Sequence, residues 1–280
     1  MKNKLLLPSL LSIALLQACG GGGGGDGDGG ASIAPVGVAE PAPGSGGTPA
    51  TPASANTGAV SAPFVAGTTP RYQLTFPDGQ SFGRLDSFVQ ASSGAMTTLG
   101  GTVLSGDSAS KEIAGDATFA MGRWAKGTVT RSSGAETLTG TDNRAYHYLA
   151  VNALAAFPAS GAKTCDAGVF TAPTYASGGT STSATGTASG SASLVFGASG
   201  AAVTGVVNVT AAGASGSASL NGTAQGVNSV AITGAYLSSG AGAAIQIGDA
   251  GNDAYIVAAT YSAVLANGAR YIGVAKFRCV

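Results

Sequence analysis

Charged side chains are scarce in this sequence, and neither sign is in excess. The 280 residues include 13 lysines and arginines and 13 aspartates and glutamates, so the formal net charge is zero. From Arg71 onward the basic and acidic residues nearly cancel and form no basic stripe. A protein that binds nucleic acid needs such a stripe to neutralise phosphates. The composition therefore excludes nucleic acid as a partner.

The chain has a single histidine, His147, in the segment RAYHYLA. A zinc site needs three or four ligands, and the sequence gathers no such set around His147. We therefore expect no metal and no cofactor. The flanking tyrosines are typical of a packed or surface residue of a strand, which is our interpretation of His147. A role as a general base or a ligand is the alternative.

Catalytic motifs are equally scarce. The segment GQSFG, residues 79–83, matches the Gly-x-Ser-x-Gly pattern, which requires a strand before the serine and a helix after it. Here Asp78 and Gly79 instead indicate a turn between two strands. The segment GDAGNDAYI, residues 248–256, resembles one copy of a calcium-binding nonapeptide, but a hairpin turn explains the same residues. We expect no enzymatic activity.

The apolar run at the start of the chain is too short to cross a membrane. Residues 5–16 are mostly apolar and follow Lys2 and Lys4, whereas a membrane-spanning helix needs roughly 20 apolar residues. A charged start and a short apolar stretch are typical of a secretory signal peptide. We assign residues 1–18 to this segment.

Cysteine is rare, and the first of the three, Cys19, directly follows the signal peptide. Residues 16–19, LQAC, resemble the lipobox of bacterial lipoproteins. The resemblance implies that Cys19 is diacylated, that the chain is cut before it, and that the new amine is acylated. Several acyl chains anchor a protein stably, whereas one is marginal. Since Gly20 follows in place of an aspartate, the resemblance also implies export to the outer membrane. A secreted protein with an accidental cysteine is the alternative.

The segment after Cys19 has almost no large apolar residue. From Gly20 to Pro70 it consists mainly of glycine, proline, alanine, serine and threonine and contains neither lysine nor arginine. Such a composition cannot bury enough surface to offset the entropy of ordering the chain. We therefore predict a disordered tether over residues 19–70, behind which residues 71–280 fold as one domain.

The remaining residues, 71–280, are dominated by strand signals. Short apolar and β-branched segments recur between clusters of Gly, Asn, Asp, Ser and Pro, as expected for an antiparallel all-β domain. Residues 148–157 are ambiguous between strand and helix. In the last strand, Tyr271, Ala275 and Phe277 share one face, which we expect to be the core face.

Between residues 177 and 244 the side chains are mostly small, and the hexapeptide SGSASL occurs twice, ending at Leu194 and Leu220. We interpret this tract as thin strands with the two copies on strands of like direction. Disorder is the alternative.

Three residues of the domain carry further expectations. Cys165 and Cys279 form an even pair in an exported chain, the setting in which disulfides form. Closing this long loop stabilises the fold by roughly 4 to 5 kcal/mol in the chain-entropy model; two free buried thiols are the alternative. Trp124 is the only tryptophan, and we expect it to anchor the core, with an exposed binding aromatic as the alternative.

The plan of the chain resembles a known group of surface proteins. The stretch LQACGGGGGG, the tether, and a β domain with GRW, HYLAV and FPASG resemble the bacterial surface lipoproteins that include transferrin-binding protein B and factor H-binding protein. The resemblance implies a single antiparallel β-barrel of about eight strands, with room for a small β-rich N-terminal extension. It also implies display on the outer membrane and binding of a host protein or of a haem or metal carrier. The chain is shorter than the two-lobed members and lacks their FYGP-type stretch, so no ligand-binding residue can be transferred.

Two functions are expected on these grounds. The first is a monomeric, surface-displayed lipoprotein that binds a host protein or a nutrient carrier through its β domain. The second is a structural or assembly lipoprotein of the cell envelope without a soluble ligand.

Overall fold

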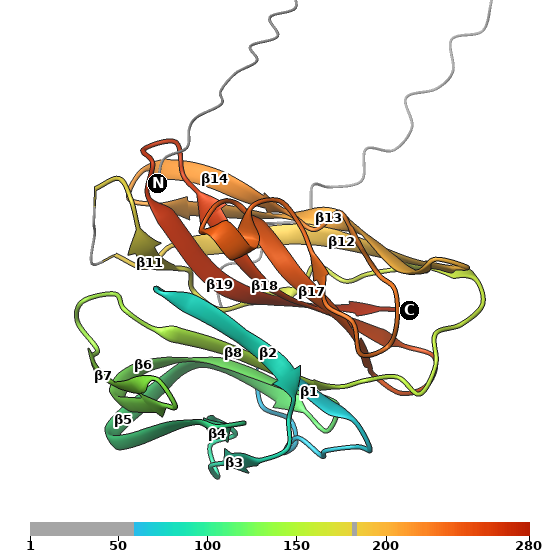
Figure 1. Ribbon diagram of the computed structural model, residues 1–280, viewed down its shortest axis with the longest axis horizontal. Helices are drawn as coiled ribbons and strands as arrows, with labels where there is room; N and C mark the ends of the chain where they lie inside the picture. Colours follow the sequence, from blue (N-terminus) through green and yellow to red (C-terminus); the bar gives the residue numbers. More distant parts are fainter. Residues whose placement is uncertain (1–58, 181–183) are drawn as a thin grey trace, which may run out of the picture. The chain divides into compact units, whose positions relative to one another are not determined.

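Strands make up nearly all the regular structure of the computed structural model, which describes residues 59–180 and 184–280 (Figure 1). The predicted all-β class is confirmed: the one helical element in these ranges is the short 3-10 helix η1 (Tyr236–Ser238). Within the same ranges, no helix has the length and apolar character needed to cross a membrane. The predicted signal peptide, Cys19 and the tether up to residue 58 lie outside the described residues.

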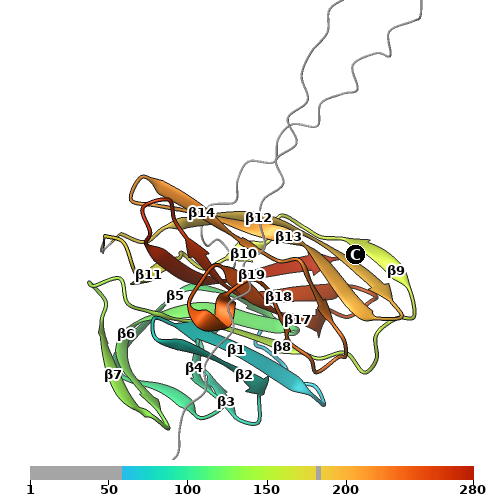
Figure 2. The same cartoon turned by 45° about the horizontal axis from the view of Figure 1, so that its top comes forward.

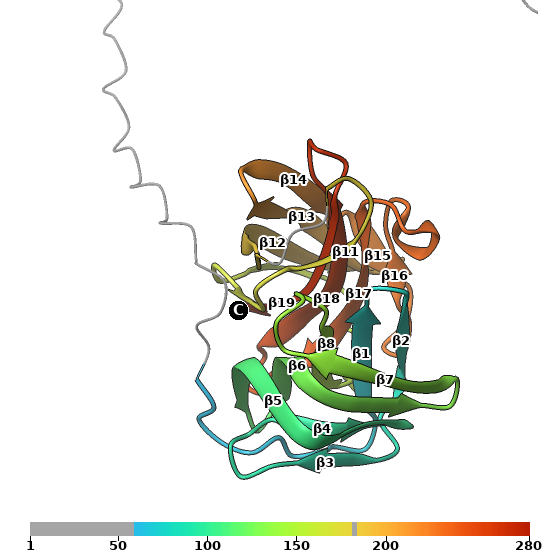
Figure 3. The same ribbon diagram turned by 90° about the vertical axis from the view of Figure 1, so that its left-hand side faces the viewer.

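The first half of the described chain forms one curled sheet, which we call the half-barrel. Its strands are β1 (Pro70–Phe76), β2 (Gly79–Arg84), β3 (Phe88–Gln90), β4 (Met96–Leu99), β5 (Thr102–Asp116), β6 (Phe119–Arg131), β7 (Gly134–Thr139) and β8 (Tyr146–Asn152). They are ordered β2-β1-β8-β6-β5-β4-β3, with β7 also paired to β6. The register of β5 and β6 shifts three times, and such bulges bend strands and increase their twist. The sheet therefore curls strongly (Figure 3).

The concave face of the half-barrel holds an aromatic core. Trp124 is fully buried there, its ring packs against Tyr146 and Tyr148, and its indole Nε1 donates a hydrogen bond to the Met96 carbonyl oxygen over 2.6 Å. The structure thus agrees with the expectation that Trp124 is a core anchor. Large aromatic side chains therefore fill the interior of this sheet.

The second half of the described chain forms two further sheets, which we call the middle sheet and the outer sheet. The middle sheet contains β10 (Val169–Phe170), β11 (Thr174–Ser177), β16 (Ala231–Ile232), β17 (Gly242–Asp249), β18 (Tyr255–Val264) and β19 (Arg270–Cys279). The outer sheet contains β9 (Gly161–Thr164), β12 (Thr187–Gly197), β13 (Gly200–Ala211), β14 (Ala214–Ser219) and β15 (Gly222–Ala224). A core that includes Val207, Val257 and Phe277 fills the space between them.

The small-residue tract forms thin strands, as predicted. The first SGSASL copy lies on β12 and the second on β14, and both strands pair antiparallel with β13. The two copies therefore run in the same direction, which confirms the expectation from the sequence. Residues 181–183, within this tract, lie outside the described ranges.

The expectation of a single antiparallel barrel of about eight strands is wrong, because the strands divide among three sheets (Figures 1 and 2). The convex face of the half-barrel is also apolar and includes Met121 and Leu149. These side chains pack against the middle sheet, whose Ile256 and Val274 belong to the same buried cluster. Strand β19 is consequently buried on both faces. The alternation of residues along β19 correctly predicted the core face that packs against the outer sheet, with Tyr271 and Phe277. The opposite face, with Val274, is also buried, against the half-barrel.

The boundary between tether and domain also needs correction. Residues 60–69, assigned to the tether, belong to the folded unit: Val60 forms a β-bridge with Gly115, and Phe64 is buried in the half-barrel core. Residues 148–157 are not helical in the structure, since β8 runs to Asn152 and the chain then leaves the sheet.

Candidate functional site

The half-barrel contains a pocket where the curled sheet does not close on itself. It has a volume of about 260 Å³. It is lined by β1, β2, the turn that begins β5, and the hairpin between β6 and β7, through Tyr72, Phe76, Ser81, Gly101, Thr102, Arg131, Ser132 and Ser133. We call it the half-barrel pocket. Segments that are far apart in the sequence build it, and only the curl of the sheet brings them together.

Strand β2 leaves room for this pocket because its concave face carries only small residues. Gly83, Ser81 and Gly79 lie opposite Tyr72, Leu74 and Phe76 of β1, respectively. An added Cβ at Gly79 would come within 3.0 Å of the Phe76 ring. The Ser81 hydroxyl is hydrogen-bonded to the Tyr72 hydroxyl over 2.9 Å.

The segment GQSFG is thus strand rather than nucleophile elbow. It forms β2, joined to β1 by a tight turn at Pro77 and Asp78. The strand, turn and strand predicted from the sequence are confirmed. Gly79 and Gly83 leave room for the rings of Phe76 and Tyr72, which lie opposite them. Ser81, between the two glycines, holds the Tyr72 ring through its hydrogen bond.

Arg131 supplies the pocket with a cation that has no carboxylate partner in the described part of the chain. It ends β6, and its guanidinium carbon lies 4.3 Å from the centroid of the Phe76 ring and 5.5 Å from that of Tyr146. The Nε atom is buried and makes no hydrogen bond. Stacking on an aromatic face leaves the in-plane donors of a guanidinium free to bind an anion.

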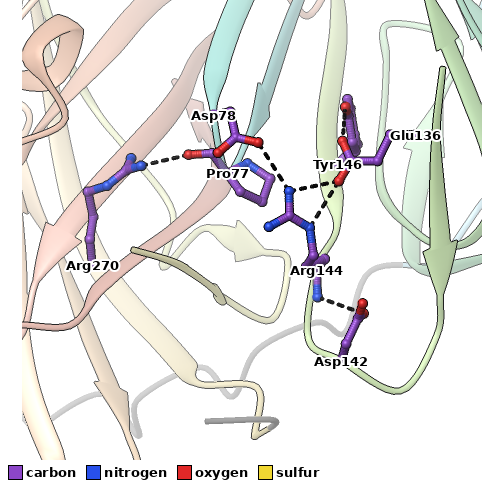
Figure 4. A network of polar contacts seen from close by, with 7 residues as sticks. All are labelled: Pro77, Asp78, Glu136, Asp142, Arg144, Tyr146 and Arg270. Atoms are coloured by element: carbon purple, nitrogen blue, oxygen red, sulfur yellow. Dashed lines mark hydrogen bonds and ion pairs between the residues drawn. The ribbon is translucent and has the colours of Figure 1, made fainter. Parts of the chain in front are cut away.

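Glu136 and Asp78 are occupied by other partners, as Figure 4 shows. The Tyr146 hydroxyl donates to Oε2 of Glu136 over 2.6 Å. Arg144 donates to Oε1 of Glu136 over 2.8 Å and to Oδ2 of Asp78 over 3.1 Å. Burial, and then the bond to Glu136, raise the pKa of Tyr146, while the pKa of Arg144 is raised by its carboxylate partners although burial alone would lower it. This network holds Tyr146, on which Phe76 stacks, and its carboxylates form no ion pair with Arg131.

Two other hollows are weaker candidates. One, of about 340 Å³, is lined by Lys111, Arg123 and Arg144 among others, but Arg123 already binds Glu112 through two hydrogen bonds and Arg144 is paired with two carboxylates. Another, of about 400 Å³, is lined by uncharged residues of segments 60–63 and 90–94. The half-barrel pocket alone of the three combines aromatic rings with an unpaired cation.

His147 does not belong to any of these hollows. It is fully buried between the half-barrel and the segment around β11, with Nδ1 2.7 Å from the Thr171 hydroxyl and Nε2 2.7 Å from the Thr174 hydroxyl. Burial, with the nearby charge of Arg123, holds its pKa well below the ordinary value. The structure agrees with the interpretation of His147 as a packed residue, neutral at pH 7 and held on both ring nitrogens.

The remaining predicted residues have structural positions away from the pocket lining. Cys165 and Cys279 are joined in a disulfide, in agreement with the expected pairing, and Thr164 and Val280 exchange two backbone hydrogen bonds beside it. The disulfide thus ties the residue after β9 of the outer sheet to β19 of the middle sheet. The lipidation residue Cys19 lies outside the described residues.

The segment GDAGNDAYI is the predicted hairpin turn. It joins β17 to β18, and Oδ1 of Asp249 accepts a hydrogen bond from the Gly251 amide over 2.7 Å. In residues 59–180 and 184–280, no group of three or more His, Cys, Asp or Glu side chains could hold a metal ion.

Sequence reasoning missed the residues of the half-barrel pocket. The period-2 pattern of β1 places Tyr72, Leu74 and Phe76 on one face, and GQSFG places small residues on the facing strand. These are the signals that could have indicated a hollow. That Arg131 enters the same hollow depends on the curl of the sheet, which no local pattern encodes.

Comparisons of the chain with protein-family models, with curated proteins and with solved structures find no match.

Proposed function

We propose that this chain is a lipid-anchored outer-membrane protein, displayed on the cell surface as a monomer, that binds its ligand through the half-barrel pocket. The ligand is a host protein or a nutrient carrier such as a haem or metal carrier. The observation that carries the proposal is Arg131, a cation over the Phe76 ring in a pocket, which has no carboxylate partner among residues 59–180 and 184–280. Pockets that combine apolar walls with a few convergent polar groups are typical ligand sites.

The anchor rests on the sequence. Residues 16–19 resemble a lipobox, and the glycine-rich segment after Cys19 gives the folded unit distance from the membrane. A lipidated, tethered β unit is suited to meeting a partner outside the cell, because acylation holds it at the membrane and the linker lets it reorient.

The pocket suggests how a partner would engage. An acidic side chain of a host protein, or a carboxylate of a bound nutrient, would pair with Arg131 while its apolar part rests against Tyr72. A charge-assisted hydrogen bond of this kind is roughly twice as strong as a neutral one. The proposal is for binding rather than catalysis, since Ser81 bonds to Tyr72 and the only histidine is held by two threonines.

A capture experiment tests the proposal. The full chain is purified, immobilised and exposed to host serum and to haem, and the bound material is identified by mass spectrometry and absorbance. Gly101→Leu places a large side chain in the pocket lining without a steric clash at Cβ, because an added Cβ at Gly101 meets nothing within 4 Å. Gly197→Leu, at an equally open glycine on the outer sheet, is the matched control.

We expect a partner that the wild type and Gly197→Leu retain and that Gly101→Leu loses. A partner retained equally by all three proteins would place binding elsewhere on the molecule. A wild type that retains neither a serum protein nor haem would contradict the proposal.

A structural role in the envelope is the second candidate, and the outer sheet favours it. Residues 167–248 contain no charged side chain, and the exposed face of this sheet carries the serines of both SGSASL copies. A flat, uncharged face suits packing against another envelope component. Protease treatment of intact cells separates the two candidates: a displayed binding protein is cut, whereas a protein that faces the periplasm resists until lysis.

A further inference from the structure

We infer that the half-barrel pocket takes a six-membered ring that carries one carboxylate. The inference rests on the proposed function, because it names the chemistry that the same pocket would recognise. It comes from four features of the pocket: its charge, its size, its aromatic wall and its hydroxyl groups.

The charge of the pocket selects a monoanion. Arg131 is the one charged residue in the lining, and no ion pair joins it to a carboxylate among the residues that the structure describes. A charge in a partly buried site without a counter-ion is unfavourable and favours a bound opposite charge. A dianion such as phosphate would carry one negative charge more than Arg131 can neutralise. The carboxylate of Glu136, which is bonded to Tyr146, would repel that second charge.

The geometry of Arg131 selects a carboxylate. Its guanidinium carbon lies over the Phe76 ring, 4.3 Å from the ring centroid, and the N–H groups of a guanidinium form a planar fork. A planar carboxylate binds such a fork through two parallel hydrogen bonds. The stacking also fixes the guanidinium orientation before the ligand arrives, which reduces the entropy lost on binding.

The size of the pocket suits a single ring, whether it is a free ligand or one exposed group of a larger partner. A volume of about 260 Å³ lies just below the usual range of roughly 300 to 1,000 Å³ for sites of drug-sized ligands. Gly101 is the open position of the lining, because a Cβ added there would meet nothing within 4 Å. Tyr72 also lines the pocket, and we infer that the ligand ring rests against its side chain.

Hydroxyl groups complete the lining and allow two sources of the same chemistry. Five residues of the lining carry a hydroxyl group, namely Tyr72, Ser81, Thr102, Ser132 and Ser133, and those of Tyr72 and Ser81 are hydrogen-bonded to each other. An aromatic carboxylate would use the Tyr72 face and Arg131 alone. A sugar acid would present its C–H face to Tyr72, its carboxylate to Arg131 and its ring hydroxyls to the serines and threonine.

Saturation-transfer difference NMR on the purified full chain tests the inference. A ligand of this size binds with a dissociation constant on the order of 1 mM, which the method measures. The probes are benzoate for the aromatic acid, glucuronate for the sugar acid, benzamide for the same ring without charge, and inorganic phosphate for a dianion. We expect benzoate or glucuronate to bind at least about tenfold more tightly than benzamide or phosphate.

Two variants locate the binding. Arg131→Gln removes the charge and should weaken binding of the carboxylate about tenfold or more. Gly101→Leu places a large side chain in the pocket lining and should abolish the saturation-transfer signal of the ligand. Arg84→Gln, which removes an exposed arginine paired with Asp86, is the charge-matched control and should leave binding unchanged. Thermal melting of each variant shows whether the fold is intact, and Gly101→Leu keeps the test decisive if Arg131→Gln is unstable.

Each outcome decides the inference. Benzoate binding alone assigns an aromatic acid, and glucuronate binding alone assigns a sugar acid. The inference is overturned if neither binds, if benzamide or phosphate binds as tightly as the carboxylates, or if binding survives both pocket variants. If neither carboxylate binds while Gly101→Leu still loses a captured partner, the ligand class is wrong but the proposed function stands. Loss of capture by the wild type itself contradicts the proposed function independently.

Discussion

Gly122 lies directly opposite Tyr148 on β6 and β8, and a Cβ added to Gly122 would be 2.4 Å from the Tyr148 hydroxyl oxygen. That hydroxyl accepts a hydrogen bond from the Met96 amide over 3.1 Å. The missing side chain of one residue thus makes room for the ring of the other. The same relationship recurs in the middle sheet between Gly273 and Tyr261.

Gly122→Ala should therefore destabilise the half-barrel. The added methyl group would displace a fully buried ring that cannot move outward, and overpacking of this kind costs about 1 to 3 kcal/mol. Urea unfolding measures the change in the free energy of unfolding. Gly101→Ala is the matched control, since its Cβ meets nothing within 4 Å. Equal stability of the two variants would show that Tyr148 can relax.

Acidification should destabilise the protein through His147. The pKa of this histidine in the folded chain is well below its ordinary value, first because of burial and second because of Arg123, whereas in the unfolded chain it is about 6.5. The unfolded chain therefore binds more protons below pH 6.5, and the free energy of unfolding falls by up to about 1.4 kcal/mol per pH unit.

The measurement is urea unfolding between pH 5.0 and 6.5, above the range in which carboxylates titrate. Since His147 is the only histidine, His147→Gln should remove this slope whatever its effect on stability at pH 7. A slope that persists in His147→Gln would assign the proton uptake to another group.

The part of the fold that could be predicted is the part that local patterns encode. Alternation along the strands identified the all-β class and the core face of β19, and turn residues located the hairpin after Pro77. The opposite face of β19 could not be predicted, because its burial depends on contact with the half-barrel through Val274.

The candidate site was hidden for the same reason. Tyr72, Gly101 and Arg131 are about 30 residues apart along the chain, and they share a pocket only because bulges in β5 and β6 curl the sheet. Composition identified His147 and Trp124 as single residues of interest, and both serve packing. A single lysine or arginine in a hairpin carries no local sign that it lacks a partner.

Reduction of the Cys165 to Cys279 disulfide should lower stability without abolishing the β structure. The bridge closes a loop with a sequence separation of 114, which the chain-entropy model values at roughly 4 to 5 kcal/mol, while the three cores remain. Urea unfolding and circular dichroism of the oxidised and reduced chain measure the two effects. Free alkylation of both thiols in the native exported protein would contradict the disulfide.

Shortening the tether should affect capture of a large partner on cells but not folding. The tether is predicted from the sequence alone, and a disordered chain as long as residues 20–58 would have a root-mean-square reach of roughly 35 Å, enough to hold the domain beyond surface polysaccharide. Halving this segment should reduce the binding of a labelled protein and leave the binding of a small solute unchanged. Equal labelling by a protein partner at both lengths would eliminate a role for the tether in access to large ligands.

Capture on intact cells tests most directly whether the chain is a displayed binding protein that uses the half-barrel pocket. Cells that carry the wild type, Gly101→Leu or Gly197→Leu are exposed to fluorescently labelled serum protein and to haem, and bound label is measured by flow cytometry before and after protease treatment. The proposed function predicts protease-sensitive labelling of cells with the wild type and Gly197→Leu, and a loss of about tenfold or more with Gly101→Leu. Equal labelling of all three cell types, or labelling that protease does not remove, would contradict it.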